Sequence, residues 1–333
     1  MFRNITFILT FLSLSALTIV SLGSNFAWKY PIELLTHFRF QYFILSLIIA
    51  GILFVLNIRR YFKNNIFLFC ALMLVAFNAM EVIPWYLPHS QQFAYDVSVL
   101  PTRLLQFNIN IQNNHYQEII DTARYESPQI ALFLEIDQKA FNELNDGLKD
   151  ILPNNFRSPV GGLALFTNLP LKNARAEDFN TNNYNLIATL LIDGEPVEFI
   201  GTHPSVPVKP STFRKRNLQL AALSDYITKI KAPLIVAGDF NVTPWSPYYK
   251  RFVTKTNLHN TRLGNGILPS WIRRASYLHY PKWLVFIMEK YFSIPIDHCF
   301  VSKHFQVAIV DIGNNSNSDH SPVITDLIFK GKS

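Results

Sequence analysis

The sequence predicts an α/β protein in which two sheets pack face to face, with helices on their outer faces and an apolar segment in front. Short apolar runs typical of β-strands dominate residues 96–333, and only two long segments there have helical spacing. Nearly all of the charge also lies after residue 95. We therefore expect two parts, residues 1–95 and residues 96–333.

Charge is distributed unevenly along the chain. Residues 1–95 contain six of the 30 Lys and Arg residues and two of the 23 Asp and Glu residues, so residues 96–333 carry a net charge of about +3. This charge is too small to predict a nucleic-acid surface by itself, although the sequence pI is about 9.3. The two cysteines, Cys70 and Cys299, fall in different parts and predict no disulfide framework.

Three apolar runs, at about residues 5–22, 42–58 and 66–85, predict transmembrane helices. A hydrocarbon core of about 30 Å needs about 20 helical residues, with about 17 as a lower limit. The runs are apolar all round, whereas helices that pack on a soluble core are amphipathic. A cleavable signal peptide is the alternative for the first run, but its charged leader is only Arg3 and two further apolar runs follow.

Basic residues in the short loops predict the orientation of these helices. The loop at residues 59–65 carries three basic residues, whereas the longer segment 23–41 carries Lys29 and Arg39. Because cytoplasmic loops are enriched in Lys and Arg, we predict a cytoplasmic N-terminus in a three-pass inner or plasma membrane protein. The second part would then lie outside the cytoplasm. Residues 84–96, with two prolines, predict a short linker.

Apolar runs bounded by polar residues predict the strands of the second part. The first, residues 103–111, alternates and then becomes polar, while the second, residues 130–134, is continuously apolar. Asp193-Gly194 separates two later runs and favours a hairpin turn. Strands are predicted at residues 103–111, 130–134, 163–167, 186–192, 196–202, 233–237, 296–301, 305–311 and 323–329.

Two segments have apolar residues on one helical face. Residues 115–125 place Ile119, Ile120 and Ala123 on the same side, and residues 213–231 repeat this spacing. Since most other connections are short, these two helices would pack outside the sheets.

Polar residues follow several of the predicted strands. Asn108 and Asn110 end the first strand, and Glu135 directly follows the second. Carboxylate and amide oxygens delivered to one end of a sheet suit a hard cation such as Mg²⁺. Each residue has an ordinary alternative, since Glu135 could be a rim residue and the asparagines could form turns.

The sequence GDFN at residues 238–241 follows the predicted strand 233–237. Gly238 would let the backbone bend as it leaves the strand. Asp239 and Asn241 are two residues apart and can point to the same side. Asp239 could accept a proton or orient a water, and Asn241 could donate to a phosphate oxygen. The alternative is an Asx turn.

Asp319 and His320 stand together in the sequence SDHSP at residues 318–322. Adjacent side chains diverge, so one could bind a hard cation while the other faces a phosphate. Asp297 is a candidate for the carboxylate that fixes the tautomer of His320. A lone histidine is usually structural, but a histidine beside one Asp and supported by a second is less often so.

Six short motifs occur in a fixed order: FNIN at residues 107–110, LE at 134–135, THP at 202–204, GDFN at 238–241, PIDH at 295–298 and SDHSP at 318–322. In order and residue identity they resemble the motifs of the endonuclease/exonuclease/phosphatase superfamily. This superfamily has the fold of pancreatic deoxyribonuclease, apurinic endonucleases, inositol polyphosphate 5-phosphatases and bacterial sphingomyelinases. The resemblance covers roughly residues 101–329. It implies a four-layered αββα sandwich with two packed, mainly antiparallel sheets between outer helices.

The resemblance implies a Mg²⁺ site, in which Mn²⁺ could substitute. Glu135 would be the main ligand, with Asn108 beside it and Asp319 as a second metal contact. Asn110 departs from the family pattern, because several nucleases of the family have Asp there, and one possible metal contact is lost. His298 stands where many members have an aromatic residue, and we interpret it as structural.

The resemblance also implies catalytic roles. Asp239 would orient or deprotonate the attacking water, and Asn241 would hold a phosphate oxygen. His320, oriented by Asp297, would stabilise the developing phosphorane charge or act as general base, while His203 would contact the phosphate on the leaving-group side. Such a site would displace a phosphoester with the help of the metal.

The segment 266–294 is rich in aromatic residues with Arg and Lys between them. It could stack the bases of a single strand, lie in a membrane interface, or form a helix packed over the sandwich. The expected function is a membrane-anchored, Mg²⁺-dependent phosphoester hydrolase, most simply a phosphodiesterase of the endonuclease or exonuclease type. A phospholipid or head-group phosphodiesterase or phosphatase is the alternative, and a non-catalytic membrane scaffold is a third interpretation. The expected partners are the bilayer and a phosphoester substrate, and we infer no protein partner.

Overall fold

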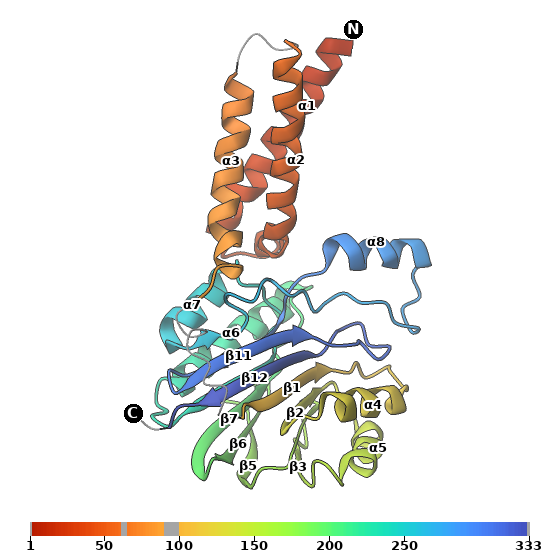
Figure 1. The fold of residues 1–333 in the computed structure, drawn as a ribbon, viewed down its shortest axis with the longest axis vertical. Helices are drawn as coiled ribbons and strands as arrows, with labels where there is room; N and C mark the ends of the chain where they lie inside the picture. Colours follow the sequence, from red (N-terminus) through yellow and green to blue (C-terminus); the bar gives the residue numbers. More distant parts are fainter. Residues whose placement is uncertain (1, 61–64, 90–99, 332–333) are drawn as a thin grey trace.

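The computed structural model describes residues 2–60, 65–89 and 100–331, which form a helix bundle standing on a sandwich of sheets (Figure 1). The predicted boundary at residue 95, part of the predicted linker and Lys63 lie outside the described residues. The bundle consists of α1 (Phe2–Gly23), α2 (Arg39–Ile58) and α3 (Ile66–Val82), with the 3-10 turns η1 (Ser24–Phe26), η2 (Ile32–Phe38) and η3 (Ile83–Trp85).

Two stretches of the bundle are long and apolar enough to cross a membrane. They are Ile32–Ile58 and Ile66–Trp85, with mean hydropathies of 2.2 and 2.3, and Ile8–Gly23 is a shorter apolar helix. Only 17% and 22% of the two longer windows are buried, which distinguishes them from core helices of a soluble domain. All three predicted apolar runs are therefore helical, and within the described chain two of them have the length of a span.

Arg39 was predicted to lie in a loop, and the structure corrects this. It is the first residue of α2 and is buried in the bundle, where Nη1 donates to the Ser21 carbonyl at 2.9 Å and to Asn78 Oδ1 at 3.0 Å. The segment before α2 therefore retains Lys29 as its only Lys or Arg.

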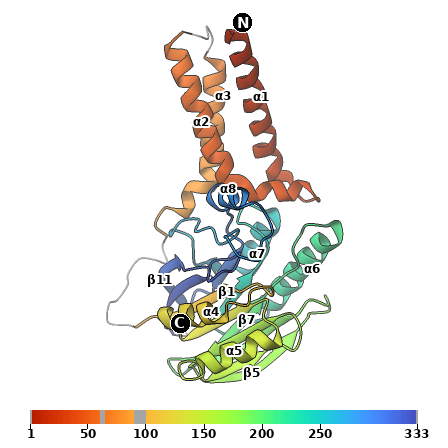
Figure 2. The ribbon, with the colours of Figure 1, turned by 90° about the vertical axis from the view of Figure 1, so that its right-hand side faces the viewer.

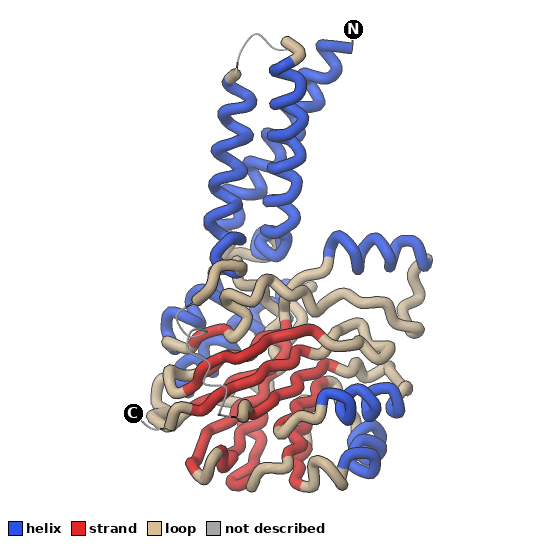
Figure 3. The backbone as a smooth tube through the Cα atoms, viewed as in Figure 1, coloured by secondary structure: helices blue, strands red, loops and turns tan. Residues whose placement is uncertain are grey.

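The second part is an α/β sandwich of two six-stranded sheets (Figure 3). In each sheet one strand pair is parallel, β1–β2 or β7–β8, and the other pairs are antiparallel, so the sheets are mixed. The first sheet has the order β11 (Phe305–Ile312), β12 (Val323–Phe329), β1 (Thr102–Asn108), β2 (Ile130–Leu134), β4 (Leu163–Thr167) and β3 (Asn154–Arg157). The second has the order β5 (Leu171–Glu177), β6 (Asn185–Ile192), β7 (Glu195–Thr202), β8 (Leu234–Asp239), β10 (Asp297–Val301) and β9 (His259–Asn260).

Three apolar clusters hold the layers together. The largest lies between the sheets and includes Leu132, Phe199 and Ile235, all fully buried. A second joins the outer face of the first sheet to α4 (Tyr116–Glu126) and α5 (Gln138–Leu148), and a third joins the second sheet to α6 (Pro210–Ile227) and α7 (Pro247–Thr256). Four helices, not the two predicted, thus cover the outer faces.

The predicted hairpin is present between β6 and β7. Ile192 pairs with Glu195 across Asp193 and Gly194, whose φ angles are 52° and 80°. Both positive angles fit the twist of a two-residue hairpin turn. The predicted strand 103–111 ends earlier, at Asn108, and β8 runs on to Asp239, beyond the predicted end at residue 237.

The bundle packs directly on the second sheet's outer layer. Val82 and Trp85 belong to the same buried cluster as Trp245 and Tyr249. Trp245 Nε1 donates to the Glu81 carbonyl at 3.0 Å, and the Gly266 N–H donates to the Trp85 carbonyl at 2.7 Å. The two parts are separate in sequence but share one apolar core.

Candidate active site

The carboxyl ends of the central strands of both sheets meet at one end of the sandwich. Asn108 ends β1 and Glu135 follows β2 in the first sheet, while His203 follows β7 and Asp239 ends β8 in the second. Gln106, inside β1, ties the sheets together here, because its Nε2 donates to the Gly238 carbonyl at 2.8 Å.

Gly238 is required by a close backbone approach. A Cβ atom at this position would lie 1.8 Å from the Thr202 carbonyl oxygen on the neighbouring strand. The expected sharp bend is absent, because β8 continues through Gly238 and pairs Asp239 with Asp297 on β10. This pairing brings two carboxylates to the same end of the sheet.

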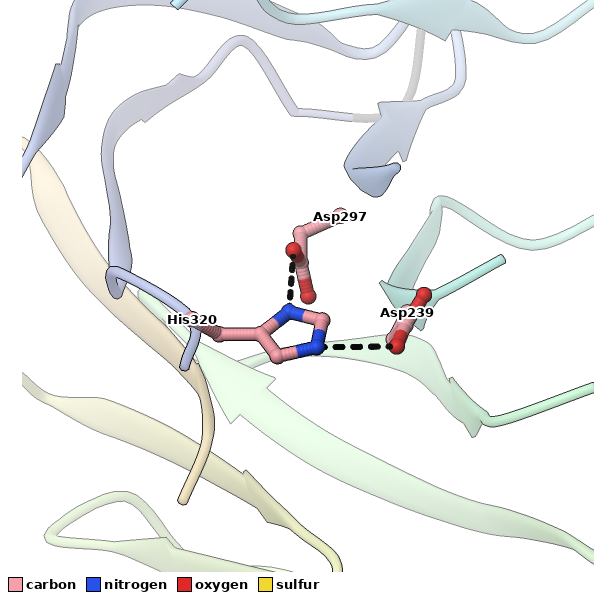
Figure 4. A group of neighbouring side chains, drawn as sticks. All are labelled: Asp239, Asp297 and His320. Carbon is pink, nitrogen blue, oxygen red and sulfur yellow. Dashed lines mark hydrogen bonds and ion pairs between the residues drawn. The ribbon is translucent and has the colours of Figure 1, made fainter. Parts of the chain in front are cut away.

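His320 lies between these two carboxylates (Figure 4). Its Nδ1 donates to Asp297 Oδ2 at 2.9 Å, and its Nε2 lies 3.7 Å from Asp239 Oδ2. Burial alone would lower the pKa of His320, but Asp297, with smaller contributions from Asp239 and Asp319, raises it to about 10. The imidazole is therefore held in its protonated form, with Asp297 fixing its orientation.

Asp239 uses its two oxygens differently. Oδ1 accepts the Asn241 N–H at 2.9 Å, which is an Asx turn, so the ordinary alternative for this motif is also present. Oδ2 accepts Asn108 Nδ2 at 3.2 Å and lies 3.6 Å from His203 Nε2. Burial and the neighbouring Asp297 raise the pKa of Asp239 to about 6, so this carboxylate can exchange a proton near neutral pH.

Glu135 lies near His203 at the same end of the sandwich, but comes from the other sheet. Its φ of 58° is rare for a residue with a side chain, and its Oε1 accepts Asn108 Nδ2 at 2.9 Å. Oε1 also lies 3.7 Å from His203 Nε2, a buried nitrogen with no hydrogen-bond partner among the described residues. His203 Nε2 thus lies within 3.7 Å of two carboxylate oxygens without a hydrogen bond to either.

The two carboxylate oxygens near His203 Nε2 could bind a divalent cation. Mg²⁺ prefers carboxylate oxygens and keeps several waters, and Glu135 Oε1 and Asp239 Oδ2 both lie close to the unpartnered His203 nitrogen. Asp239, Asp297 and His320 form a second buried group whose ligand atoms lie within 4.8 Å of one another. The first set suits Mg²⁺ better, because its two carboxylates, Glu135 and Asp239, come from different residues that are not bonded to an imidazole, whereas Asp297 in the second set is already bonded to His320.

Asn108 turns its amide nitrogen toward Glu135, and its Oδ1 accepts the Asn110 N–H at 3.1 Å. Metal ligation through the amide oxygen would require the amide to rotate. Asp319 lies further out and accepts Asn110 Nδ2 at 2.9 Å. The predicted metal contacts of both residues stay predictions.

Two aromatic residues of the segment 266–294 contact the site, and sequence reasoning did not single them out. Tyr277 OH donates to Asp319 Oδ1 at 2.8 Å, and Trp271 Nε1 donates to Asp319 Oδ2 at 3.1 Å. The aromatic composition of the segment was visible in the sequence, but nothing in it indicated which rings would face a carboxylate.

Asn241 is held by two further groups. Its Nδ2 donates to the Pro204 carbonyl at 2.9 Å, and its own carbonyl accepts Nη1 of Arg216 at 2.9 Å. Arg216 lies on α6 and is fully buried. Sequence reasoning missed this residue, because an arginine within an amphipathic helix is ordinarily exposed.

His298 is structural in this geometry, as predicted. Its Nε2 donates to the Val242 carbonyl at 2.8 Å, and its Nδ1 accepts Asn260 Nδ2 at 2.9 Å. Burial lowers the pKa of His298 to about 3, which keeps the ring neutral.

The comparison with family models decides the class of this fold and site. The model of the Endonuclease/Exonuclease/phosphatase family matches residues 105–320, about two thirds of the chain. The chain belongs to this family. The endonuclease/exonuclease/phosphatase family and its structural neighbours are hydrolases of phosphoester bonds, so the predicted enzyme class is confirmed.

Solved structures of this fold have low sequence identity to the chain. TDP2 of D. rerio in complex with a single-strand DNA product is 13% identical, with a TM-score of 0.55 over 69% of this chain and 99% of that one. Two further structures are each 15% identical, with a TM-score of 0.50 over 68% of this chain and 99% of the other. They are sphingomyelinase C of Streptomyces griseocarneus and a doubly substituted beta toxin of Staphylococcus aureus with bound magnesium ions. A search of curated proteins found no match to the sequence.

Proposed function

We propose that this chain is a membrane-anchored phosphodiesterase that hydrolyses its substrate with the help of Mg²⁺, for which Mn²⁺ could substitute. One observation carries the proposal: the carboxylates of Glu135 and Asp239 converge on His203 Nε2, a buried nitrogen without a hydrogen-bond partner among the described residues. The magnesium ions bound to beta toxin, which has the same fold, support the choice of metal.

Glu135 would hold the cation in this proposal, with Asn108 beside it and Asp319 as a second contact. When bound, the cation would neutralise charge on a phosphoryl oxygen and on the leaving oxygen. Asp239 and His320 are the groups of this chain that would move or hold protons.

Asp239 would orient the attacking water and accept its proton, since a carboxylate with a pKa of about 6 can act as a base near neutral pH. Protonated His320, fixed by Asp297, would donate to the developing negative charge. His203 would contact the phosphate on the leaving-group side. Asn241 would hold a phosphate oxygen by exchanging its bond to the Pro204 carbonyl for one to the substrate.

The membrane location rests on the helix bundle. α2 and α3 would span the bilayer, and α1 would accompany them as a third pass, so that residues 1–95 anchor the catalytic domain of residues 96–333. Arg59 and Arg60 stand at the end of α2 remote from the sandwich (Figure 1). Because basic residues favour the cytoplasmic side, the sandwich would lie outside the cytoplasm.

Nucleic acid is the first candidate substrate class, as the single-strand DNA product bound to TDP2 suggests. A phospholipid head group is the second candidate, and α8 (Lys282–Phe292) favours it. Its side chains are mostly exposed, with Trp283 at 66% and Tyr291 at 55%, so the expected packing over the sandwich is slight. α8 projects to one side at the level of the base of the bundle, on the same side as α4, which follows β1 of the site (Figure 1).

Hydrolysis by the full-length protein in detergent tests the function. Plasmid DNA, RNA and phosphatidylcholine–phosphatidylglycerol vesicles would be offered side by side with Mg²⁺. Asp239→Ala and His320→Ala should abolish activity, and Glu143→Ala, an exposed carboxylate of α5, serves as the matched control. Retained activity in both site variants would place the reaction at a different site, and no hydrolysis of any of the three substrates by the wild-type protein would favour the scaffold interpretation.

A further inference from the structure

A cavity lies away from the active site, between the segment before η2 and the helices α6 and α7. Its volume is about 650 Å³. Figure 2 shows α6 and α7 beneath the lower end of the helix bundle. Its lining includes aromatic and basic residues: Trp28, Lys29, Tyr30, Phe213, Arg214 and Arg251.

The cavity is basic. Lys29, Arg214 and Arg251 come from three different segments and are all exposed, and no Asp or Glu is among the described residues that line it. In the described parts of the chain, no carboxylate lies within ion-pair distance of any of the three. Arg251 contributes slightly to the lowered pKa of Asp225, but the main cause is the bond of Asp225 to Lys255. The cavity therefore offers three positive charges to an anion.

The chain position of the cavity indicates its depth relative to a bilayer. Trp28 and Tyr30 come directly before the candidate span Ile32–Ile58. Tyr248 OH donates to the Trp28 carbonyl at 2.7 Å, and Tyr30 OH donates to the Val208 carbonyl at 2.9 Å, so this segment is fixed on the sandwich. Trp and Tyr are enriched where a span leaves the hydrocarbon for the head groups.

We propose that this cavity binds the phosphate-bearing head group of an anionic membrane phospholipid. The inference rests on the membrane anchoring of the proposed function, but not on the reaction. Arg214 and Arg251 can each form paired bonds to phosphate oxygens. In the proposed topology this cavity faces the leaflet away from the cytoplasm, so the lipid would be an anionic phospholipid of that leaflet, whose charge attracts juxtamembrane Lys and Arg. Trp28 and Tyr30 would lie beside the glycerol region.

The cavity adjoins the support of the active site. Phe213 and Tyr248, which line it, contact each other edge to face, and the guanidinium of Arg216 lies 5.2 and 5.5 Å from their ring centres. Arg216 in turn donates to the Asn241 carbonyl. A bound head group would thus touch the same two rings that contact Arg216.

Lipid binding by the full-length protein tests the proposal. Native mass spectrometry would compare dioctanoyl-phosphatidylglycerol with dioctanoyl-phosphatidylcholine, using proteins that also carry Asp239→Asn so that no lipid is hydrolysed. The variant K29Q/R214Q/R251Q removes the three charges of the cavity. The variant K172Q/K231Q/K303Q removes three exposed lysines elsewhere and is the matched control.

We expect the phosphatidylglycerol affinity to fall about tenfold or more in the cavity variant and to be unchanged in the control. Equal losses in both variants, or no loss, would overturn the proposal. Displacement of the lipid by inorganic phosphate at similar concentrations would also overturn it, because the cavity would then bind a soluble phosphate.

Arg214→Gln alone should give a smaller loss in the same direction, which provides a second variant if the triple variant does not fold. Because binding is measured without turnover, failure of the proposed reaction would not affect the result.

Discussion

The Glu33 carboxylate lies 3.0 Å from the guanidinium of Arg216, and both side chains are fully buried. Glu33 belongs to η2 at the base of the bundle, whereas Arg216 lies on α6 and donates to the Asn241 carbonyl of the active-site loop. A residue of the apolar N-terminal part is therefore two contacts away from a candidate catalytic residue. The segment at the base of the bundle thus supports the active-site loop through Arg216.

Glu33→Gln should weaken both the fold and the reaction. The change leaves Arg216 buried without its counter-charge, which we expect to cost up to about 3 kcal/mol of unfolding free energy. Since Arg216 positions Asn241 but does not touch substrate, kcat should fall several-fold while KM changes little. Thermal unfolding and steady-state kinetics in detergent measure these effects, with Glu143→Gln as control.

Partial recovery of kcat in Glu33→Asp would identify charge as the cause. Wild-type kcat in Glu33→Gln, with or without a lower Tm, would show that the ion pair has no role in positioning the loop.

The separated domain, residues 96–333, should be less stable than the full chain. Truncation removes Glu33 and exposes the cluster in which Val82 and Trp85 pack. For a domain of this size the loss of the ion pair alone predicts a Tm lower by about 6–12 °C. In this truncated protein Arg216→Met should be less harmful than in the full chain, because the arginine no longer has its partner. An equal Tm for the truncated and full-length proteins would show that residues 96–333 fold independently of the bundle.

The parts of the fold that could be predicted are those specified by local patterns. β2 and β4 are continuous apolar runs, and Asp193-Gly194 determines its hairpin. β5, by contrast, reads LKNARAE and packs only Leu171 and Ala174 against the core, so its apolar pattern is too weak to predict a strand. α7 begins at a proline and has aromatic residues in place of a clear apolar stripe.

The same distinction applies to the site. The eight predicted site residues lie at or next to the ends of strands. Seven of them have a hydrogen bond or a contact within 3.7 Å to another of the eight. Asp319 is connected to Asn108 through Asn110. Arg216 could not be predicted, because its partners Glu33 and Asn241 are distant in sequence and only the packing of η2 on α6 brings them together.

Activity should depend on pH with two limbs. Asp239 acts as a deprotonated carboxylate, so activity falls as the pH drops through about 6 or lower, where the carboxylate is protonated. His320 acts as the protonated ring, so activity also falls as the pH rises through about 10. Asp297→Asn removes the largest charge contribution that raises the pKa of His320, and should move the alkaline limb down by about one pH unit or more. An alkaline limb that stays in place would exclude His320 as its origin.

Removal of divalent metal should abolish hydrolysis reversibly. EDTA treatment followed by added Mg²⁺ should restore activity in the wild-type protein. Glu135→Gln should raise the Mg²⁺ concentration needed for half-maximal recovery at least about tenfold, because it removes the charged ligand oxygen. Asp319→Asn should give a smaller rise if Asp319 is a second contact. Mg²⁺ titrations of activity and of calorimetric heat distinguish weaker metal binding from slower chemistry, and unchanged titrations in Glu135→Gln would place the metal elsewhere.

The exposed face of α8 should distinguish the two substrate classes. Trp283→Ser with Phe286→Ser removes large apolar area from a helix whose only fully buried side chain is Val285, so the fold should be retained. If the substrate is a phospholipid, hydrolysis of vesicles should fall about tenfold or more, because the helix no longer holds the site at the bilayer surface. Hydrolysis of the soluble diester bis(p-nitrophenyl) phosphate should be unchanged. Tyr125→Ser with Ile309→Ser, which removes two large exposed apolar side chains from other elements, is the matched control. Loss of DNA cleavage in the α8 variant, with vesicle hydrolysis absent throughout, would instead indicate that these rings stack on a single strand.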